Sequence, residues 1–269
     1  MSRFHDGRGG GGATARGVRV TRRRFGLTAG CAFASLAFGE ACRVGTETRP
    51  LSDGRLTARP TGGAVTSLET GALGLGRGDR DGMIQMPSAP VQGPLPLLVF
   101  LHGATQNGAG MLRRVGPAAD RAGVALIAPD SRGTTWDAIR SGFGADVAFL
   151  NRVLEHAFAH LAIDPARVAI GGFSDGASYA ISLGLANGDL FPRVVALSPG
   201  FVVSAPTHGR PRFFVSHGRS DPILPIDQCS RVIVPRLRSR GYDVTFREFD
   251  GGHGMPPTVA NEAMRWIVA

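Results

Sequence analysis

Gly172-Phe173-Ser174-Asp175-Gly176 fits the pattern G-x-S-x-G, and the residues on either side of it decide the expected fold. The apolar run 168–170 before the motif predicts a buried strand, and the Ala-, Ser- and Leu-rich stretch 175–186 after it predicts a helix. A serine between such a strand and helix occupies a sharp, strained turn, and the flanking glycines leave room for it. We therefore predict a nucleophile elbow with Ser174 as the nucleophile. The alternative is a tight turn whose serine only caps the helix.

Strand-like and helix-like segments alternate around this motif. Apolar runs predict strands at 83–86, 97–101, 124–128, 194–197, 213–216 and 244–249, and helical spacing predicts helices at 146–161, 226–240 and 257–268. Asp164-Pro165 predicts a turn ahead of the strand that carries the motif. This alternation favours an α/β fold with a mostly parallel sheet and helices on both faces. The loop 199–211 is too short for a sizeable lid domain.

A serine nucleophile needs a base, because its hydroxyl is a weak nucleophile at neutral pH. In an elbow fold the order along the chain is serine, acid and histidine. His253 lies in Gly251-Gly252-His253-Gly254, between the last predicted strand and the last predicted helix, and we select it as the base. His217 ends a strand and is expected under the acid loop, while His208 lies in a polar loop without a supporting pattern.

The acid is selected from four aspartates that follow the serine. Asp221 lies in a short loop that follows a predicted strand, and the next residue is a proline that stiffens the turn. We therefore predict that Asp221 orients His253. Asp227 is expected to begin a helix, where the helix dipole favours a carboxylate. Asp250 precedes the histidine loop and is expected to shape it; Asp243 is the fourth candidate.

The backbone N–H groups of Ala104 and Asp175 are the expected oxyanion donors. A tetrahedral intermediate needs donors that are fixed in advance. Ala104 follows the strand 97–101 and the pair His102-Gly103, and Asp175 follows the nucleophile. Trp136, Phe143 and Phe201 are candidates for lining the substrate pocket, although core packing is the favoured role for any single one of them.

The first 42 residues resemble an export signal of the twin-arginine type. Arg22 and Arg23 stand directly before a weakly apolar run, 27–38, which suits a signal-peptide core and is too short to span a bilayer. The alternative is a basic tail beside a short buried helix. Cys42 stands where a lipid-anchored cysteine would stand, although Gly39-Glu40-Ala41 is a poor lipobox. We expect a signal at 1–42, a polar linker at 43–62, a catalytic domain at 63–269 and a periplasmic or extracellular protein.

Charge and cysteine usage exclude other classes. Seven arginines against Asp6 and Glu40 place +5 of the net charge of +9 in residues 1–42, and the remaining +4 is scattered. Without a basic stripe, we do not expect nucleic-acid binding. The sequence contains neither an H-E-x-x-H motif nor a cluster of Cys and His residues, so we do not expect a metal site. Cys229 is the single cysteine of the expected domain, so we expect no disulfide within it.

Four motifs in this order resemble the phospholipase/carboxylesterase group of α/β-hydrolases. They are His102-Gly103, the motif around Ser174, Gly218-Arg219-Ser220-Asp221-Pro222 and Gly251-Gly252-His253. Esterases similar to polyhydroxybutyrate depolymerases and feruloyl esterases share the Asp164-Pro165 lead-in. One departure is that Asp175-Gly176-Ala177 stands where the group often has Gln-Gly-Gly. The resemblance implies hydrolysis of carboxylic esters through an acyl-enzyme, without cofactor or metal.

Two other functions are compatible with this order of catalytic residues. A peptidase of the prolyl-oligopeptidase type uses the same triad order, but the segment before the first strong strand is too short for the propeller domain of those enzymes. A catalytically silent hydrolase fold that binds a partner is the other, and such proteins typically lack a triad member. Because the loop 199–211 is short, we expect an open site that favours small or medium acyl chains.

Overall fold

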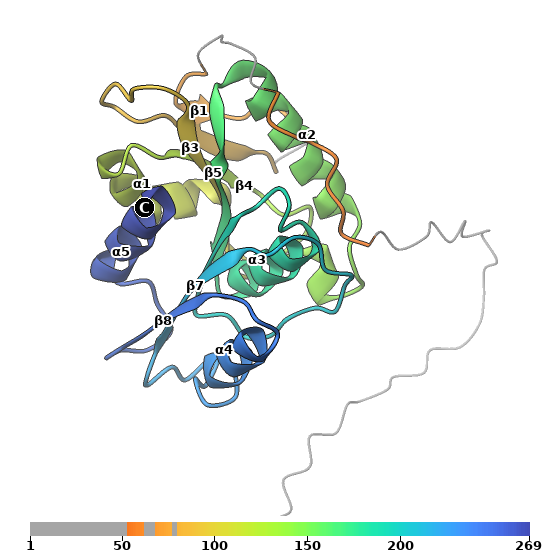
Figure 1. Cartoon of the computed structure of the whole chain (residues 1–269), viewed down its shortest axis with the longest axis vertical. Helices are drawn as coiled ribbons and strands as arrows, with labels where there is room; N and C mark the ends of the chain where they lie inside the picture. The colour runs from red at the N-terminus through yellow and green to blue at the C-terminus, as the bar shows by residue number, and fades with distance from the viewer. Residues whose placement is uncertain (1–52, 62–67, 77–79) are drawn as a thin grey trace, which may run out of the picture. The chain divides into compact units, whose positions relative to one another are not determined.

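The computed structural model describes residues 53–61, 68–76 and 80–269 (Figure 1). The expected export signal, Cys42 and the first ten residues of the expected linker lie outside these ranges. None of the helices in the described ranges has the length and apolar character needed to cross a membrane.

An eight-stranded sheet forms the centre of the described domain, in the order β1-β2-β4-β3-β5-β6-β7-β8. The strands β3 to β8 run parallel, and β1 and β2 add an antiparallel edge. The strands are β1 (Gly71–Ala72), β2 (Gly82–Gln85), β3 (Leu95–Leu101), β4 (Ala125–Pro129), β5 (Ile163–Phe173), β6 (Arg193–Leu197), β7 (Arg212–Gly218) and β8 (Val244–Phe249).

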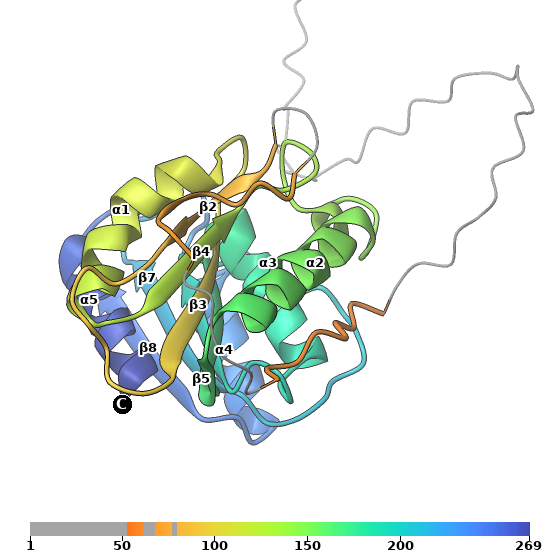
Figure 2. The ribbon, with the colours of Figure 1, turned by 90° about the horizontal axis from the view of Figure 1, so that it is seen from above.

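Helices cover both faces of this sheet. They are α1 (Gly108–Arg121), α2 (Ala145–His160), α3 (Asp175–Ala186), α4 (Ser230–Ser239) and α5 (Pro257–Val268), with a short 3₁₀ helix, η1, at Asp137–Ile139. Apolar side chains of α1 and α5 form one core cluster with one sheet face, and those of α2, α3 and α4 form the other (Figure 2). Hydrophobic burial on two faces explains why the central strands are continuous apolar runs. The predicted α/β architecture is therefore confirmed.

Helix α1 was not predicted, because its sequence contains Gly108, Gly110, Gly116 and Pro117. These residues are poor helix formers. The helix nevertheless begins cleanly, since the side chain of Asn107 accepts a hydrogen bond from the N–H of Gly110 at 2.9 Å. A side chain at Gly108 would overlap the carbonyl oxygen of Ala128, so close packing on β4 requires glycine there.

The predicted turn at Asp164-Pro165 lies inside strand β5. The pairing with β3 moves from Leu95 and Ile163 to Leu97 and Val168, so the residues between them form a bulge. The Asp164 carboxylate accepts from the N–H of Ala166 at 2.9 Å, which is the hydrogen bond of a turn. The local turn signal is therefore present, but pairing with β3 begins before it.

Residues 53–61 pack on the domain, although we expected a linker over 43–62. The side chains of Leu56 and Ala58 are buried in the core cluster on the α2 and α3 face. The buried side chain of Asn187 accepts from the N–H of Leu56 and donates to the carbonyl of Gly54, both at 2.8 Å. The polar composition concealed this contact, because only two of the nine residues, Leu56 and Ala58, bury apolar side chains in the core. The 63–269 boundary of the catalytic domain stays a prediction.

Cys229 is free and buried just before α4. Burial is the main cause that raises the pKa of its thiol.

Candidate active site

Ser174 lies at the junction of β5 and α3 in a strained conformation. Its φ of 57° falls in the left-handed region, which is costly for a residue with a side chain. Its backbone N–H is held by the carbonyl of Leu197 on β6 at 3.0 Å. A side chain at Gly172 would overlap Gly176, and one at Gly176 would overlap Leu101. The G-x-S-x-G glycines are thus required by the close crossing of α3 over β3.

His253 contacts Ser174 from the loop between β8 and α5. Its Nε2 lies 2.9 Å from Ser174 Oγ, and its Nδ1 lies 2.7 Å from Oδ2 of Asp221. With Asp221 ionised, Nδ1–H donates to the carboxylate and Nε2 accepts from the serine hydroxyl. The imidazole ring also packs on Phe173, with 4.8 Å between ring centroids. The structure therefore brings together the three residues selected from the sequence.

Asp221 is 5% exposed and lies in the loop after β7. Burial pushes the pKa of its carboxyl up, but hydrogen bonds from the N–H of Leu224 and from His253 outweigh burial, so the pKa is lowered. Its Oδ1 accepts from the N–H groups of Ile223 and Leu224, both at 2.9 Å. The carboxylate is therefore held ionised and oriented by its own loop.

His217 lies beneath this acid, as expected from the sequence. Its ring is fully buried, and burial lowers its pKa, which favours the neutral form. Nε2–H donates to the carbonyl of Leu224 at 2.7 Å, and Nδ1 accepts from the hydroxyl of Ser230 at 2.7 Å. Nε2 also lies 3.2 Å from the Asp221 carboxylate. His217 thus fixes the acid loop against the start of α4.

The three competing aspartates each pair with a surface arginine. Asp250 bonds Arg219 at 2.6 Å and its side chain is 90% exposed. Asp227 bonds Arg231 at 2.8 Å, and Asp243 bonds an arginine on β7 at 2.8 Å. Their side chains bond these arginines and not His253.

The two expected oxyanion donors come from different segments: Ala104 lies in the loop after β3, and Asp175 is the first residue of α3. Within the described residues, neither the N–H of Ala104 nor that of Asp175 donates to a protein acceptor. A Cβ placed on Gly103 would lie 3.3 Å from Cβ of Ser174, so this loop approaches the nucleophile closely. Two free N–H groups near a serine hydroxyl suit a developing oxyanion.

His102 holds this loop from below. Its pKa is lowered by burial, so it is neutral, and Nδ1–H donates to the carbonyl of Gly103 at 2.7 Å. Its Nε2 accepts from the N–H of Ser131 at 3.0 Å. The indole N–H of Trp136 donates to the carbonyl of His102 at 2.8 Å. His102 and Trp136 therefore order the backbone of the loop.

Two of the three aromatic pocket candidates are core residues. Trp136 is fully buried, and Phe143 is buried against Tyr179. Both side chains belong to the core cluster on the α2 and α3 face, and both rings contact Tyr179 of α3. Their roles as pocket residues are thus replaced by roles in packing. Phe201 is 39% exposed, on the loop after β6.

Sequence reasoning missed side chains that join distant segments to the elbow. The Thr135 hydroxyl donates to the Asp175 carboxylate at 2.6 Å, and the Tyr179 hydroxyl donates to Asp137 at 2.8 Å. Ser198, with φ of 54°, donates from its hydroxyl to the carbonyl of Gly254 beside the histidine, at 3.3 Å. No local pattern marks these residues, since each contact depends on the tertiary fold.

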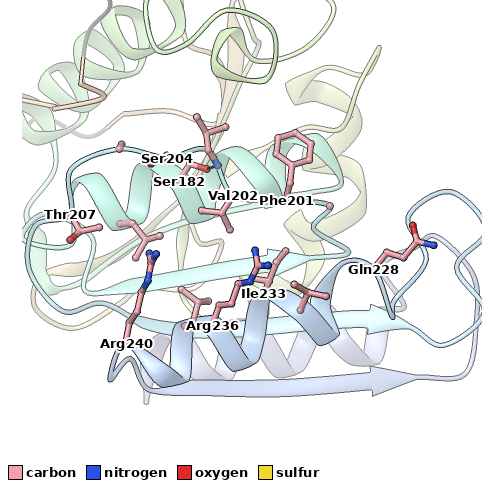
Figure 3. A pocket seen from close by; sticks show the side chains of 15 residues that line it. Ser182, Phe201, Val202, Ser204, Thr207, Gln228, Ile233, Arg236 and Arg240 are labelled. Atoms are coloured by element: carbon pink, nitrogen blue, oxygen red, sulfur yellow. Dashed lines mark hydrogen bonds between the residues drawn. The ribbon is translucent and has the colours of Figure 1, made fainter. Parts of the chain in front are cut away.

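A groove lies between the loop 200–207 and helices α3 and α4 (Figure 3), and its lining includes none of Ser174, Asp221 and His253. Phe201 and Gln228 lie toward one end of it, and Thr207 and Arg240 toward the other. In the described part of the chain, no group of His, Cys, Asp and Glu side chains could hold a metal ion.

Residues 135–268 match the phospholipase/carboxylesterase family, and this stretch contains the whole Ser174, Asp221 and His253 constellation. The chain is an α/β-hydrolase of the phospholipase/carboxylesterase group. The match supports the prediction of an enzyme of the serine hydrolase type.

Relatives of this hydrolase include NocK of Nocardia uniformis subsp. tsuyamanensis, 31% identical over 68% of the chain and 54% of NocK. Feruloyl esterase C of Emericella nidulans is 30% identical over 49% of the chain and 57% of the relative. The chain spans about half the length of these curated relatives.

Solved structures share the fold of this hydrolase. Esterase PE8 superimposes with a TM-score of 0.58 at 20% identity, over 70% of the chain and 98% of PE8. The Bacillus cereus carboxylesterase gives a TM-score of 0.55 at 18% identity, over 71% of the chain and 94% of that enzyme. At these identities the likeness concerns the fold alone.

Proposed function

We propose that this hydrolase cleaves carboxylic esters through an acyl-enzyme on Ser174. The observation that carries the proposal is the unbroken hydrogen-bond chain from Ser174 Oγ through His253 to Asp221. A serine, an imidazole and a buried carboxylate in this order form the arrangement that activates a serine hydroxyl. The family match and the esterase names of relatives support esters as the substrate class.

In the proposed reaction, Ser174 Oγ attacks the ester carbonyl carbon while His253 Nε2 takes the hydroxyl proton. The Asp221 carboxylate keeps Nδ1 protonated and stabilises the imidazolium that forms. The N–H groups of Ala104 and Asp175 donate to the negative oxygen of the tetrahedral intermediate. His253 then protonates the leaving alcohol oxygen. A water molecule, deprotonated by the same imidazole, attacks the acyl-enzyme and releases the acid.

Substitution of the nucleophile tests the proposal. We expect Ser174→Ala to lower kcat for p-nitrophenyl acetate by at least about 10³-fold, leaving a remainder from the oxyanion donors. Ser220→Ala is the matched control, because this serine is exposed on the acid loop and its hydroxyl has no hydrogen-bond partner within the described residues. A folded Ser174→Ala protein with near-normal turnover would overturn the assignment.

A fluorophosphonate probe separates this proposal from a catalytically silent binding protein. The probe should label the parent chain and leave Ser174→Ala unlabelled, whereas a silent fold would label neither. A peptidase of the prolyl-oligopeptidase type would also be labelled, and it would cleave peptide substrates with a higher kcat/KM than aryl esters.

We further propose a preference for small to medium acyl chains. Within the described residues the loop between β6 and β7 contains no helix that could act as a lid. A site without a lid offers a long acyl chain little apolar surface, so activity should peak at short to medium length. A series of p-nitrophenyl esters of increasing acyl length measures this preference.

Export is proposed on the sequence of residues 1–42. Arg22 and Arg23 before the apolar run support the twin-arginine route, with Cys42 as a candidate lipid-anchored residue. Replacing both arginines by lysine should retain the protein in the cytoplasm. Normal export of that variant would argue against this route.

A further inference from the structure

The groove between loop 200–207, α3 and α4 has a volume of about 310 Å³. This volume lies at the lower end of the range of small-molecule sites. Polar and apolar groups line it in nearly equal measure, and the apolar side chains come from all three segments: Leu185, Val202, Val203, Val232, Ile233 and Leu237. Val202 is 36% exposed and Phe201 is 39% exposed, so apolar surface is open to solvent here. The groove can therefore take an apolar chain.

One end of this groove adjoins the acid loop of the active site. The N–H of Gly200 donates to Ser178 Oγ at 2.9 Å, one turn of α3 beyond the nucleophile. Gly200 also approaches the side chain of Leu224, whose N–H bonds the Asp221 carboxylate. Ser182 lines the groove eight residues after Ser174, which is about 12 Å along the helix axis. A chain that starts at the nucleophile could thus extend into the groove.

The far part of the groove carries two arginines without acceptors. Arg236 of α4 and Arg240, which directly follows the helix, line it, and their side chains extend toward the loop 200–207 (Figure 3). The other arginines of the helix are engaged: Arg231 bonds Glu248 at 2.7 Å, and Arg238 donates to the carbonyl of Val244 at 2.9 Å. Within the described residues, neither Arg236 nor Arg240 has a side-chain partner.

No acidic side chain lines the groove to balance these two charges. A guanidinium pair beside apolar walls complements a ligand with an apolar body and an anionic end. A carboxylate fits best, because its two oxygens can accept from the planar donors of arginine.

We propose that the groove binds the distal part of the ester substrate, and that this part is an apolar chain ending in a carboxylate. This inference rests on the proposed esterase function and specifies its substrate class. The ester carbonyl lies at Ser174, the methylene chain packs on the walls formed by Val203 and Ile233, and the carboxylate pairs with Arg236 and Arg240. The natural substrates are then half-esters of medium-length dicarboxylic acids or esters of long ω-hydroxy acids.

Two matched pairs of substrates test the inference. In the acyl pair, the p-nitrophenyl half-ester of dodecanedioic acid is compared with p-nitrophenyl dodecanoate, which has the same length and lacks the charge. In the alcohol pair, the acetyl ester of 12-hydroxydodecanoic acid is compared with dodecyl acetate. The measured quantity is the ratio of kcat/KM, charged over uncharged, in each pair.

The parent chain should favour the charged substrate in one of the pairs. Arg236→Gln combined with Arg240→Gln should lower that ratio about tenfold, mostly through KM. The matched control is Arg231→Gln combined with Arg238→Gln, which removes the same charge from the same segment and should keep the parent ratio. Equal ratios in the parent and the Arg236/Arg240 variant, in both pairs, would overturn the inference. A fall of the same size in the control would also overturn it, because general electrostatic attraction would then explain the preference.

A binding experiment separates this inference from the esterase proposal. Calorimetric titration of Ser174→Ala protein with dodecanedioate should show binding that is lost when Arg236 and Arg240 are also replaced. If the parent chain hydrolyses no ester while dodecanedioate still binds in this way, the esterase proposal fails and the carboxylate site stands. If the esters are hydrolysed but dodecanedioate binding does not depend on these arginines, the carboxylate site fails and the esterase proposal stands.

Discussion

The Asp221 carboxylate is buried and accepts hydrogen bonds from three donors. Removing its charge is therefore the most informative single substitution at the site. Asp221→Asn keeps the shape but offers only one acceptor oxygen, and its amide N–H₂ would face donors. The imidazole of His253 would then favour the wrong tautomer, so we expect kcat to fall by up to about 10⁴-fold with little change in KM. Turnover of p-nitrophenyl acetate by the purified, folded variant measures the effect.

Asp250 and Asp227 provide controls for this prediction. Asp250 is 90% exposed and is bonded to Arg219, so Asp250→Asn should change kcat by less than about tenfold. Asp227→Asn should change only the free energy of unfolding, by about 1 kcal/mol or less. A severely impaired Asp250→Asn protein beside a near-normal Asp221→Asn protein would move the acid to Asp250.

At the residue scale, the sequence predicted the serine, the acid and the histidine because each has a local signal. The glycines around Ser174 and His253 and the strand before Asp221 can be recognised in the linear chain. Trp136 and Phe143, named as pocket candidates with core packing as the favoured role, are buried in the core. An aromatic residue in a loop has the same local pattern whether it faces a cavity or the core, and here the chain before α2 folds inward.

At the scale of elements, Asn187 joins the end of α3 to the segment 53–61. It is fully buried and makes three side-chain hydrogen bonds, to Leu56, Gly54 and Leu183. Asn187→Ala leaves buried backbone groups without partners, so we expect the free energy of unfolding to fall by about 3 kcal/mol. Chemical denaturation measures it.

Asn261→Ala is the matched control for Asn187→Ala. This asparagine makes one exposed hydrogen bond, with Arg121, and its loss should change the free energy of unfolding by less than about 0.5 kcal/mol. Equal destabilisation by both substitutions would contradict the role given to Asn187.

Most of the elements could be predicted from the sequence, and the exceptions have a physical cause. Helix α3 and strand β8 have the predicted bounds because their periodicity is clear and their ends are marked. Helix α1 escaped prediction since packing on β4 requires glycine where propensity disfavours it. The contact of residues 53–61 escaped too, because it depends on a side chain more than a hundred residues away.

At the scale of the whole molecule, we predict that the buried carboxyl of Asp146 makes the fold more stable at mildly acidic pH than at neutral pH. Burial, opposed by the N–H of Arg132 and reinforced by the charge of Asp137, raises its pKa from 3.8 to about 6. At pH values between 3.8 and about 6, this carboxyl is more often protonated in the folded state than in the unfolded state. Its titration therefore raises the free energy of unfolding as pH falls from about 7 to 4. The contribution is at most about 3 kcal/mol.

The test compares the parent chain with Asp146→Asn, which removes the titration. Other carboxyls titrate in both proteins, so the difference between their free energies of unfolding isolates Asp146. The difference should grow in favour of the parent as pH is lowered from 7 to 4. A difference that stays constant over this range would show that Asp146 has an ordinary pKa in the folded chain.

Two truncations test where the folded unit begins. A chain starting at residue 43 should unfold with the same free energy as the full chain, within about 0.5 kcal/mol. A chain starting at residue 62 loses the burial of Leu56 and the partners of Asn187, so we expect it to be less stable by about 3 kcal/mol or more. Equal stability of both truncated chains would show that residues 53–61 contribute nothing to the fold.

The buried thiol of Cys229 can report local unfolding of the region around it. In a chain starting at residue 43 it is the single cysteine, and its side chain is 6% exposed beside the acid loop. An alkylating reagent can reach the sulfur only when α4 and that loop separate from the sheet. The rate of alkylation in native buffer would therefore measure how often the region that holds Asp221 unfolds locally, without any dye or engineered label.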